Sequence, residues 1–348
     1  MQLPRNAQLW LPGLIRSRLS RPAFDGPVTV WLLFADHYEP RWRRADLDTA
    51  RSRVAAWAAR WPVIAEEHRD HFDRPAQYTF FYPEEEYHPE LLDPLAAMAR
   101  AGVADVEVHI HHDREGETDF VERMSGFVSN LRDRHGLLHE EAGRTVFGFI
   151  HGNWALDNAH PSGRWCGLNN ELTLLRQLGC YADFTLPAAP DPCQVGQVNS
   201  IYWATDDPGR PRSHERGIPV RPGGTPPASS LLMVQGPLTL RWNGLRPALE
   251  VGELAGHDPV TPSRVEAWLN AAPRIGNHLF VKLHGHGAPE KNAAPLLEKD
   301  LAAALSLTRA ACERRGWQLA HATAWQAYGA VAALVRGTNP LASLEQER

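Results

Sequence analysis

"VTVWLLFA" (residues 28–35) is a continuous run of apolar and β-branched residues that leads directly into "DHYEP" (36–40). A strand buried on both faces carries such a run, whereas a strand exposed on one face alternates apolar and polar residues. Strands of the first kind are typical of parallel sheets that are covered by helices on both sides. The stretch therefore predicts a central parallel strand with a polar carboxyl end.

Strand-like and helix-like patterns alternate along the rest of the chain. Further strands are predicted at residues 77–83, 103–111, 144–152, 197–205, 229–236 and 278–287. Helical spacing lies between them, and an alanine-rich helix is predicted at 291–315. Repeated units of this kind predict an α/β fold with a parallel sheet, open or closed into a barrel. The Pro-, Gly- and Arg-rich stretch at 206–227 is expected to be a surface loop.

The composition excludes several classes of protein. The 348 residues are 43% hydrophobic and 22% charged, which is ordinary for a soluble domain, and the net charge of −5 offers no basic surface for nucleic acid. No apolar run reaches the roughly 18 residues of a membrane span, and no signal peptide is recognisable, so a cytoplasmic protein is expected. "LWLPGLIRSRL" (9–19) mixes apolar and basic residues and allows a peripheral membrane contact. The sequence indicates no oligomeric state.

The cysteines and glycines carry no familiar motif. Cys166, Cys180, Cys193 and Cys312 show no CxxC spacing and are expected to be free, buried thiols. No GxGxxG or GxxxxGK[ST] follows a predicted strand, which leaves dinucleotide and P-loop sites without support.

Histidines and acids gather where the predicted strands end. Four apolar runs close in this way, in "FADHYEP" (34–40), "EVHIHHD" (107–113), "FIHGNWALDN" (149–158) and "LHGHG" (283–287). The carboxyl ends of parallel strands meet at one rim, where α/β folds build their active sites. Side chains alternate along a strand, so His109 and His111 point the same way. Imidazoles and carboxylates at such a rim predict a divalent metal site, with zinc as the best match.

A hydrolytic metal site needs two further groups, a base that accepts a proton from water and an acid that protonates the leaving atom. Asp36 and His37 are adjacent, so one can bind metal while the other transfers a proton. His284 or His286 can supply the acid.

The order of these motifs resembles that of the polysaccharide deacetylase superfamily, which are metal-dependent hydrolases. In the first family motif, an apolar strand ends in two adjacent acids, a general base and a metal ligand. The resemblance implies that Asp36 is the base and that His37 replaces the ligand acid. The second family motif has two metal-binding histidines four residues apart. "HIHHD" stands in its place but departs from it, because Glu115 and not a histidine lies four residues after His111.

The resemblance implies further assignments. The metal would be held by His37, His109 and His111, with the set still open among the following residues: Asp36, His37, Glu39, His109, His111, His112 and Asp113. The last family motif corresponds to "KLHGHG" (282–287), with His284 or His286 as general acid. The implied fold is a distorted (β/α)7-type barrel over residues 27–348, a single domain preceded by an extension at 1–26, with the active site at the carboxyl ends of the strands.

A group of polar and aromatic residues suits a sugar. The candidate substrate-binding residues are His151, Asn153, Trp154, Asp157, Glu171 and His286. Amides and carboxylates bond hydroxyl groups, and indoles stack on pyranose rings; alternatively, the tryptophans belong to the core and the asparagines cap turns. The resemblance implies removal of an N- or O-linked acetyl group from a saccharide.

Two other functions stay open from the sequence. A glycoside hydrolase on a related barrel would need two carboxylates, such as Asp36 with Asp157, Glu171 or Asp183. A non-catalytic saccharide-binding protein would use the histidines for structural zinc or for no metal at all.

Overall fold

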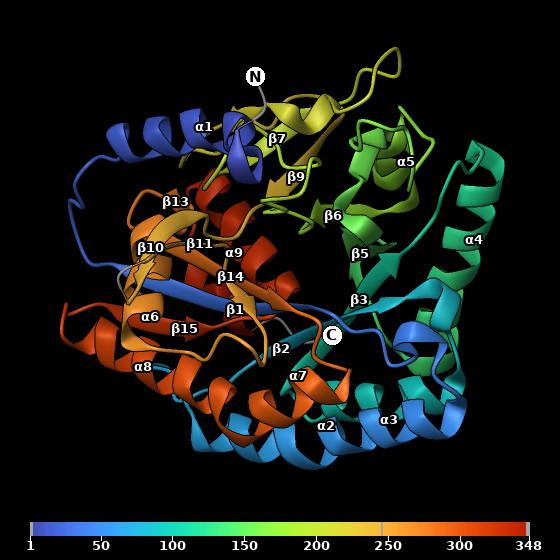
Figure 1. Cartoon of the computed structure of the whole chain (residues 1–348), viewed down its shortest axis with the longest axis horizontal. Coiled ribbons are helices and arrows are strands. Elements are labelled where there is room, and N and C mark those ends of the chain that lie inside the picture. Colours follow the sequence, from blue (N-terminus) through green and yellow to red (C-terminus); the bar gives the residue numbers. More distant parts are fainter. Residues whose placement is uncertain (1–2, 245, 346–348) are drawn as a thin grey trace.

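A sheet of thirteen strands, most of them parallel, organises residues 3–244 and 246–345, which are described by the computed structural model (Figure 1). The strands of the chain are β1 (Thr29–His37), β2 (Tyr78–Pro83), β3 (Ala104–Ile110), β4 (His139–Glu141), β5 (Arg144–His151), β6 (Cys180–Asp183), β7 (Ile201–Thr205), β8 (Ile218–Pro219), β9 (Ser230–Val234), β10 (Thr239–Asn243), β11 (Arg246–Glu250), β12 (Glu253–Leu254), β13 (Arg274–Ile275), β14 (His278–Gly285) and β15 (Gln318–His321).

The strand order is β12-β14-β1-β2-β3-β5-β6-β9-β7-β8, with β13 beside β14, β15 beside β1 and β4 beside β5. Strands β10 and β11 form a separate antiparallel hairpin. The predicted α/β fold with a mainly parallel sheet is confirmed. Within the described residues no pairing joins β8 to β12, so the sheet is not closed by strand hydrogen bonds and the (β/α)7 barrel stays a prediction.

All nine residues of β1 are buried, as its apolar run predicted. Strand β14 pairs with one side of β1, and β2 and β15 pair with its other side. Alternate residues face two different apolar layers: Val30, Leu32 and Phe34 pack in one, and Trp31 and Leu33 in the other. The strand continues beyond the predicted end, through His37.

Helices cover both faces of the sheet. They are α1 (Ala7–Leu19), α2 (Leu47–Glu67), α3 (Pro89–Arg100), α4 (Glu117–Ser129), α5 (Glu171–Leu178), α6 (Pro262–Ala271), α7 (Glu290–Pro295), α8 (Leu301–Glu313) and α9 (Ala324–Arg336). Helices α2, α3 and α8 lie along one side in Figure 1 and belong to the larger apolar layer, whereas α9 packs in the other. The helix predicted at 291–315 is α7 and α8 joined by a π-helical turn at Leu296–Asp300.

A buried lysine connects two strands that are not neighbours in the sheet. The Lys282 ammonium on β14 donates hydrogen bonds to Phe184 O and to Leu186 O, at 2.6 Å from the latter, just after β6. Burial lowers the pKa of Lys282, and the charge of Asp183 counteracts that effect. Strand β6 is separated from β14 by four strands in the sheet order, so the sheet curves far enough for a side chain to bridge it.

Most of segment 206–227 is exposed, as predicted for a surface loop, but part of it is anchored to the rest of the chain. It contains a 3-10 turn at Ser213–Glu215 and strand β8, and His214 is completely buried. The Arg212 guanidinium donates to the carbonyl oxygens of Ala159, Pro192 and Gln194. Charged and polar residues anchor this segment through hydrogen bonds, which a count of its apolar residues could not reveal.

The N-terminal extension includes a docked helix. Trp10 and Leu14 of α1 are buried against Val198 and Leu238, whereas Leu19 at the end of the helix is 83% exposed. No helix in the described part of the chain is both long and apolar enough to cross a bilayer. The peripheral membrane contact of residues 9–19 stays a prediction.

We expect Lys282→Met to lower the free energy of unfolding by about 2–5 kcal/mol, because two buried carbonyls and the Asp183 carboxylate lose their cationic partner. Urea denaturation of both proteins measures the difference. Lys299→Met, at an exposed lysine, is the matched control and should change stability little. An unchanged midpoint for Lys282→Met would show that the bridge contributes nothing.

Candidate metal centres

Five side chains converge where β1, β3 and β14 end, and we call them the rim cluster: His37, Glu39, His109, His111 and His286. Glu39 is at the centre. Its Oε1 lies 3.6 Å from His109 Nε2 and 3.7 Å from His111 Nε2. The possible ligand atoms of Glu39, His109 and His111 lie within 4.8 Å of one another, and so do those of Glu39, His37 and His286.

In His109 and His111, Nδ1 points away from Glu39 and contacts a hydrogen-bond acceptor. His109 Nδ1 lies 2.8 Å from Ile150 O, and because a carbonyl accepts, Nδ1 carries the proton. Its Nε2 is therefore the unprotonated nitrogen, buried and without a hydrogen-bond partner among the described residues. His111 Nδ1 contacts the Glu85 carboxylate. Metal-binding histidines are typically oriented in this way, by a carbonyl or a carboxylate on the second nitrogen.

The charges of the rim cluster favour neutral imidazole at His37 and an ionised carboxylate at Glu39, whereas they favour a proton on His111. Burial, together with the neighbouring His286 and His109, holds the pKa of His37 well below its usual value. Burial would raise the pKa of Glu39, but the neighbouring imidazoles of His109, His286 and His111 outweigh it and lower that pKa. For His111, burial is outweighed by Glu85, which raises its pKa. Neutral imidazole and carboxylate are the forms that bind a divalent ion, so this donor set fits one.

A cavity of about 400 Å³ adjoins the rim cluster, and Trp154, His284, Glu253 and the chain from 187 to 192 line it. The Trp154 ring lies 6.3 Å from that of His37 and 6.4 Å from that of His286. Trp154 Nε1 and His284 Nδ1 have no hydrogen-bond partner within the described parts of the chain. A ligand in this cavity would therefore meet an indole and an imidazole, while these two nitrogens are themselves buried.

Asp36 lies on the opposite side of β1 from His37 and does not join the rim cluster. Both of its carboxylate oxygens accept the Gly287 N–H, at 2.9 and 3.0 Å. Burial raises the pKa of Asp36 to about 7, and Glu39 adds to that rise. Asp36 thus fixes the turn that carries His284 and His286.

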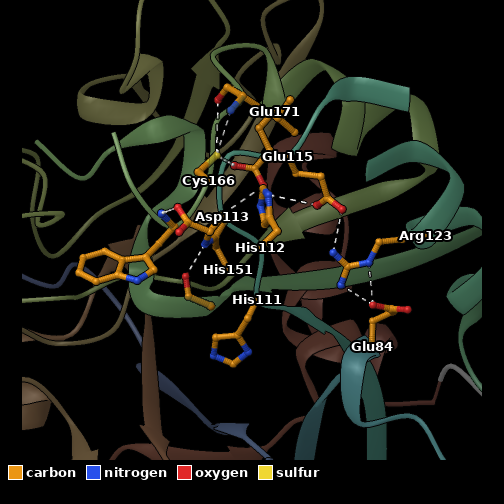
Figure 2. A network of polar contacts seen from close by, with 12 residues as sticks. Glu84, His111, His112, Asp113, Glu115, Arg123, His151, Cys166 and Glu171 are labelled. Atoms are coloured by element: carbon orange, nitrogen blue, oxygen red, sulfur yellow. Dashed lines mark hydrogen bonds and ion pairs between the residues drawn. The ribbon is translucent and has the colours of Figure 1, made fainter. Parts of the chain in front are cut away.

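A second group of possible ligands lies beside the first, and we call it the buried cluster: His112, His151, Cys166 and Glu171. Figure 2 shows these side chains turned toward one another, while the ring of His111 points away from them. Glu171 Oε1 lies 3.1 Å from His112 Nε2 and 3.4 Å from His151 Nε2. All four residues are buried.

The structure separates the predicted substrate-binding residues into two sets. Trp154 lines the cavity, and His286 belongs to the rim cluster, with its ring 6.4 Å from that of Trp154. Asn153, next to Trp154 in the chain, is exposed. His151 and Glu171 lie in the buried cluster, and Asp157 is completely buried, with Oδ2 accepting the Ser213 N–H. We therefore assign no substrate contact to His151, Asp157 or Glu171, since no part of their side chains reaches a surface.

Among the open metal ligands, Asp113 is also excluded from both clusters. It is exposed and accepts the Trp165 N–H at 2.7 Å. A third group, Asp105, Glu107 and His139, lies near the start of β3. Its carboxylates already accept protein donors, including His139 at 2.7 Å and the N–H of Gly148.

Sequence reasoning missed the central role of Glu39 and did not identify Glu85 or Cys166. Glu39 follows His37 by two residues and shares its face, a signal of the same kind as the spacing of His109 and His111. Cys166 precedes Glu171 by five residues, a spacing that a search for CxxC cannot find. Glu85 belongs to a run of three acids, and only its contact with His111 distinguishes it from its neighbours.

We expect Glu85→Gln to weaken metal binding about 10- to 100-fold, because His111 loses the carboxylate that orients its ring and raises its basicity. Competition with a chromophoric chelator measures the affinity. Glu90→Gln, on the surface and paired with Arg51, is the control. Equal affinity in all three proteins would exclude His111 as a ligand.

The chain was also compared with known proteins. No protein-family model matches its sequence, and none of the curated proteins does so either.

Proposed function

We propose that this protein is a metal-dependent hydrolase that removes an N- or O-linked acetyl group from a saccharide. The observation that carries the proposal is the pair His109 and His111, whose inner nitrogens face Glu39 at the carboxyl ends of parallel strands, beside a cavity. Active sites of parallel α/β folds occupy this position. The motif order of the polysaccharide deacetylases and their (β/α)7-type barrel are consistent with such a site.

The rim cluster would hold the metal ion. Glu39, His109 and His111 supply one carboxylate and two imidazoles, and His37 or His286 can complete the set. Zinc is the ion that we propose, because imidazole and carboxylate ligands in a small site suit it. When bound, the ion would polarise the acyl carbonyl and lower the pKa of a water molecule.

The cavity would receive the saccharide. Trp154 lines the cavity and offers an aromatic ring for stacking against a pyranose. His284 lines the same cavity and is our candidate for the group that protonates the leaving amine or alcohol; burial holds its pKa well below the usual value, so the role requires that bound substrate and metal change its surroundings. The acyl group would then lie between His284 and the rim cluster.

Asp36 would act from behind this site. Its hydrogen bonds to Gly287 hold the turn from which His284 and His286 project. The role as proton acceptor that the motif resemblance implies stays a prediction for this residue, and a positioning role is the alternative that its contacts suggest.

The glycoside hydrolase alternative finds less support. It would need two carboxylates on either side of a sugar ring. Asp36, Asp157, Glu171 and Asp183 are all buried, with at most 1% of each residue exposed. None of these carboxylates can contact a saccharide in the cavity without a rearrangement of the chain.

We expect the zinc-loaded protein to release acetate from acetylated amino sugars, and His284→Gln to lower kcat by about 10²–10⁴ on an amide substrate. The loss should be much smaller on an activated aryl ester, because its leaving group departs without a proton. Acetate release and chromogenic ester hydrolysis are the two measurements.

His257→Gln, at an exposed histidine, serves as the control for His284. Equal losses on both substrates would give His284 a binding role instead. If the loaded protein released acetate from none of a broad panel of acetylated saccharides, the hydrolase proposal would fail and saccharide binding without catalysis would replace it.

We expect Asp36→Asn to abolish most turnover, by about 10²–10⁴, while the metal content stays unchanged, if Asp36 accepts a proton. An asparagine Oδ1 can still accept the Gly287 N–H, so a positioning role predicts substantial activity for Asp36→Asn and a large loss only for Asp36→Ala. Steady-state kinetics and metal analysis of both variants separate the two roles.

A further inference from the structure

In the buried cluster, two hydrogen-bond acceptors face each other with no hydrogen atom between them. His151 Nδ1 contacts Gly152 O, so Nδ1 carries the proton and the lone pair of Nε2 faces Glu171 Oε1 at 3.4 Å. His151 is completely buried, and within the described residues its Nε2 has no hydrogen-bond partner. Two acceptors that face each other without water repel, and a cation between them removes the repulsion.

We propose that His112, His151, Cys166 and Glu171 bind a second divalent ion, zinc, in a closed structural site. Glu171 Oε1 lies 3.1 and 3.4 Å from the Nε2 atoms of His112 and His151, and Glu171 Oε2 lies 3.3 Å from Cys166 Sγ. Tetrahedral zinc with its usual bond lengths places neighbouring ligand atoms about 3.3–3.7 Å apart. Small side-chain shifts therefore suffice to form the site.

Two backbone donors face Cys166 and would stabilise a metal-bound thiolate, although burial and the Glu171 charge hold the pKa of the free thiol well above its usual value. Its Sγ accepts the backbone N–H groups of Asn158 at 3.3 Å and of Leu168 at 3.4 Å. A neutral thiol is a weak acceptor, whereas a negative sulfur gains from two such donors. Metal binding transfers the thiol proton to solvent, because the thiolate is the form that ligates.

A carboxylate lies close to the outer nitrogen of His112, without a hydrogen bond between them. Its Nδ1 lies 3.3 Å from Glu115 Oε2, and Glu115 Oε1 accepts from Arg123 at 2.8 Å. Arg123 also pairs with Glu84, so that Figure 2 shows a chain of alternating charges leading away from the cluster. A carboxylate on the second nitrogen of a histidine is typical of metal sites.

The position of the cluster explains why an ion would be useful there. The chain from 152 to 170, between β5 and α5, has no regular element longer than a 3-10 turn. Trp154, Asp157 and Trp165 have positive φ angles of 54°, 52° and 66°, which cost energy in non-glycine residues. An ion that joins β3, β5, this segment and α5 would hold Trp154 at the cavity wall. With no exposed ligand and no open position, the site would be structural.

Cobalt(II) is the probe for this site, because a cobalt–thiolate bond gives near-ultraviolet charge-transfer absorption that nitrogen and oxygen ligands do not. We expect the metal-depleted protein, refilled with cobalt, to show this band. Cys166→Ala should abolish the band, remove one equivalent of bound metal and lower Tm. Cys193→Ala, at a buried cysteine outside the cluster, should keep the band, the metal content and the Tm of the wild-type protein.

His111→Ala separates this proposal from the proposed hydrolase, since it should remove the rim-cluster ion and leave the thiolate band intact. Absence of the band from the wild-type protein, or its persistence in Cys166→Ala, would overturn the proposal. If Cys166→Ala does not fold, Cys180→Ala, Cys193→Ala and Cys312→Ala decide. A band that each of them retains comes from Cys166, and a band that one of them loses comes from that other cysteine.

Discussion

The burial of β1 on both faces is the constraint on which the rest of this structure depends. Its interior residues pack in two separate apolar layers, so a polar side chain in the middle of the strand would be desolvated without a partner. Polar groups are tolerated at the end of the strand, where other segments of the same chain offer them hydrogen-bond partners. Asp36 and His37 occupy that place and face opposite sides, one toward the Gly287 turn and the other toward His109 and His286. The ionisable side chains of β1 are therefore found at its carboxyl end and not among its interior residues.

The rim cluster and the buried cluster use the same local device. In each, a histidine presents one nitrogen to a carbonyl, Ile150 O or Gly152 O, and this contact fixes which nitrogen stays unprotonated. A carboxylate, Glu39 or Glu171, then faces the free nitrogens. The clusters differ in access: His111 and His286 of the rim cluster are partly exposed beside a cavity, whereas the buried cluster is sealed. This difference in access suits the rim cluster to the proposed hydrolysis and the buried cluster to the proposed structural ion.

The sealed cluster and the rim cluster are joined through the chain itself. His111 and His112 are adjacent but belong to different clusters, because consecutive side chains at a strand end point in opposite directions. The segment that carries Cys166 also carries Trp154, which lines the cavity. We therefore expect order in the buried cluster to help hold Trp154 at the cavity wall. Lys282 on β14 also supports the cavity wall. It binds the chain just after β6, and that chain continues into the wall of the cavity.

The sequence by itself determined the α/β class, the central strand and the edge at which the polar residues gather. These features follow from local patterns: continuous apolar runs mark doubly buried strands, and alternation places His109 and His111 on one face. Tertiary structure decided which of those residues meet. His151 and Glu171 resembled substrate contacts in the sequence but lie in a sealed cluster with Cys166, and Glu39, two residues after His37, is at the centre of the rim cluster. The strand-end pattern places a residue near the rim but does not give its depth or its partner across the sheet. The depth of a residue and its partner depend on the curvature of β1, β3, β5 and β14 and on where the long connections between these strands are anchored. The contacts that fix the curvature and the anchoring join residues far apart in the chain, so local sequence patterns do not reveal them.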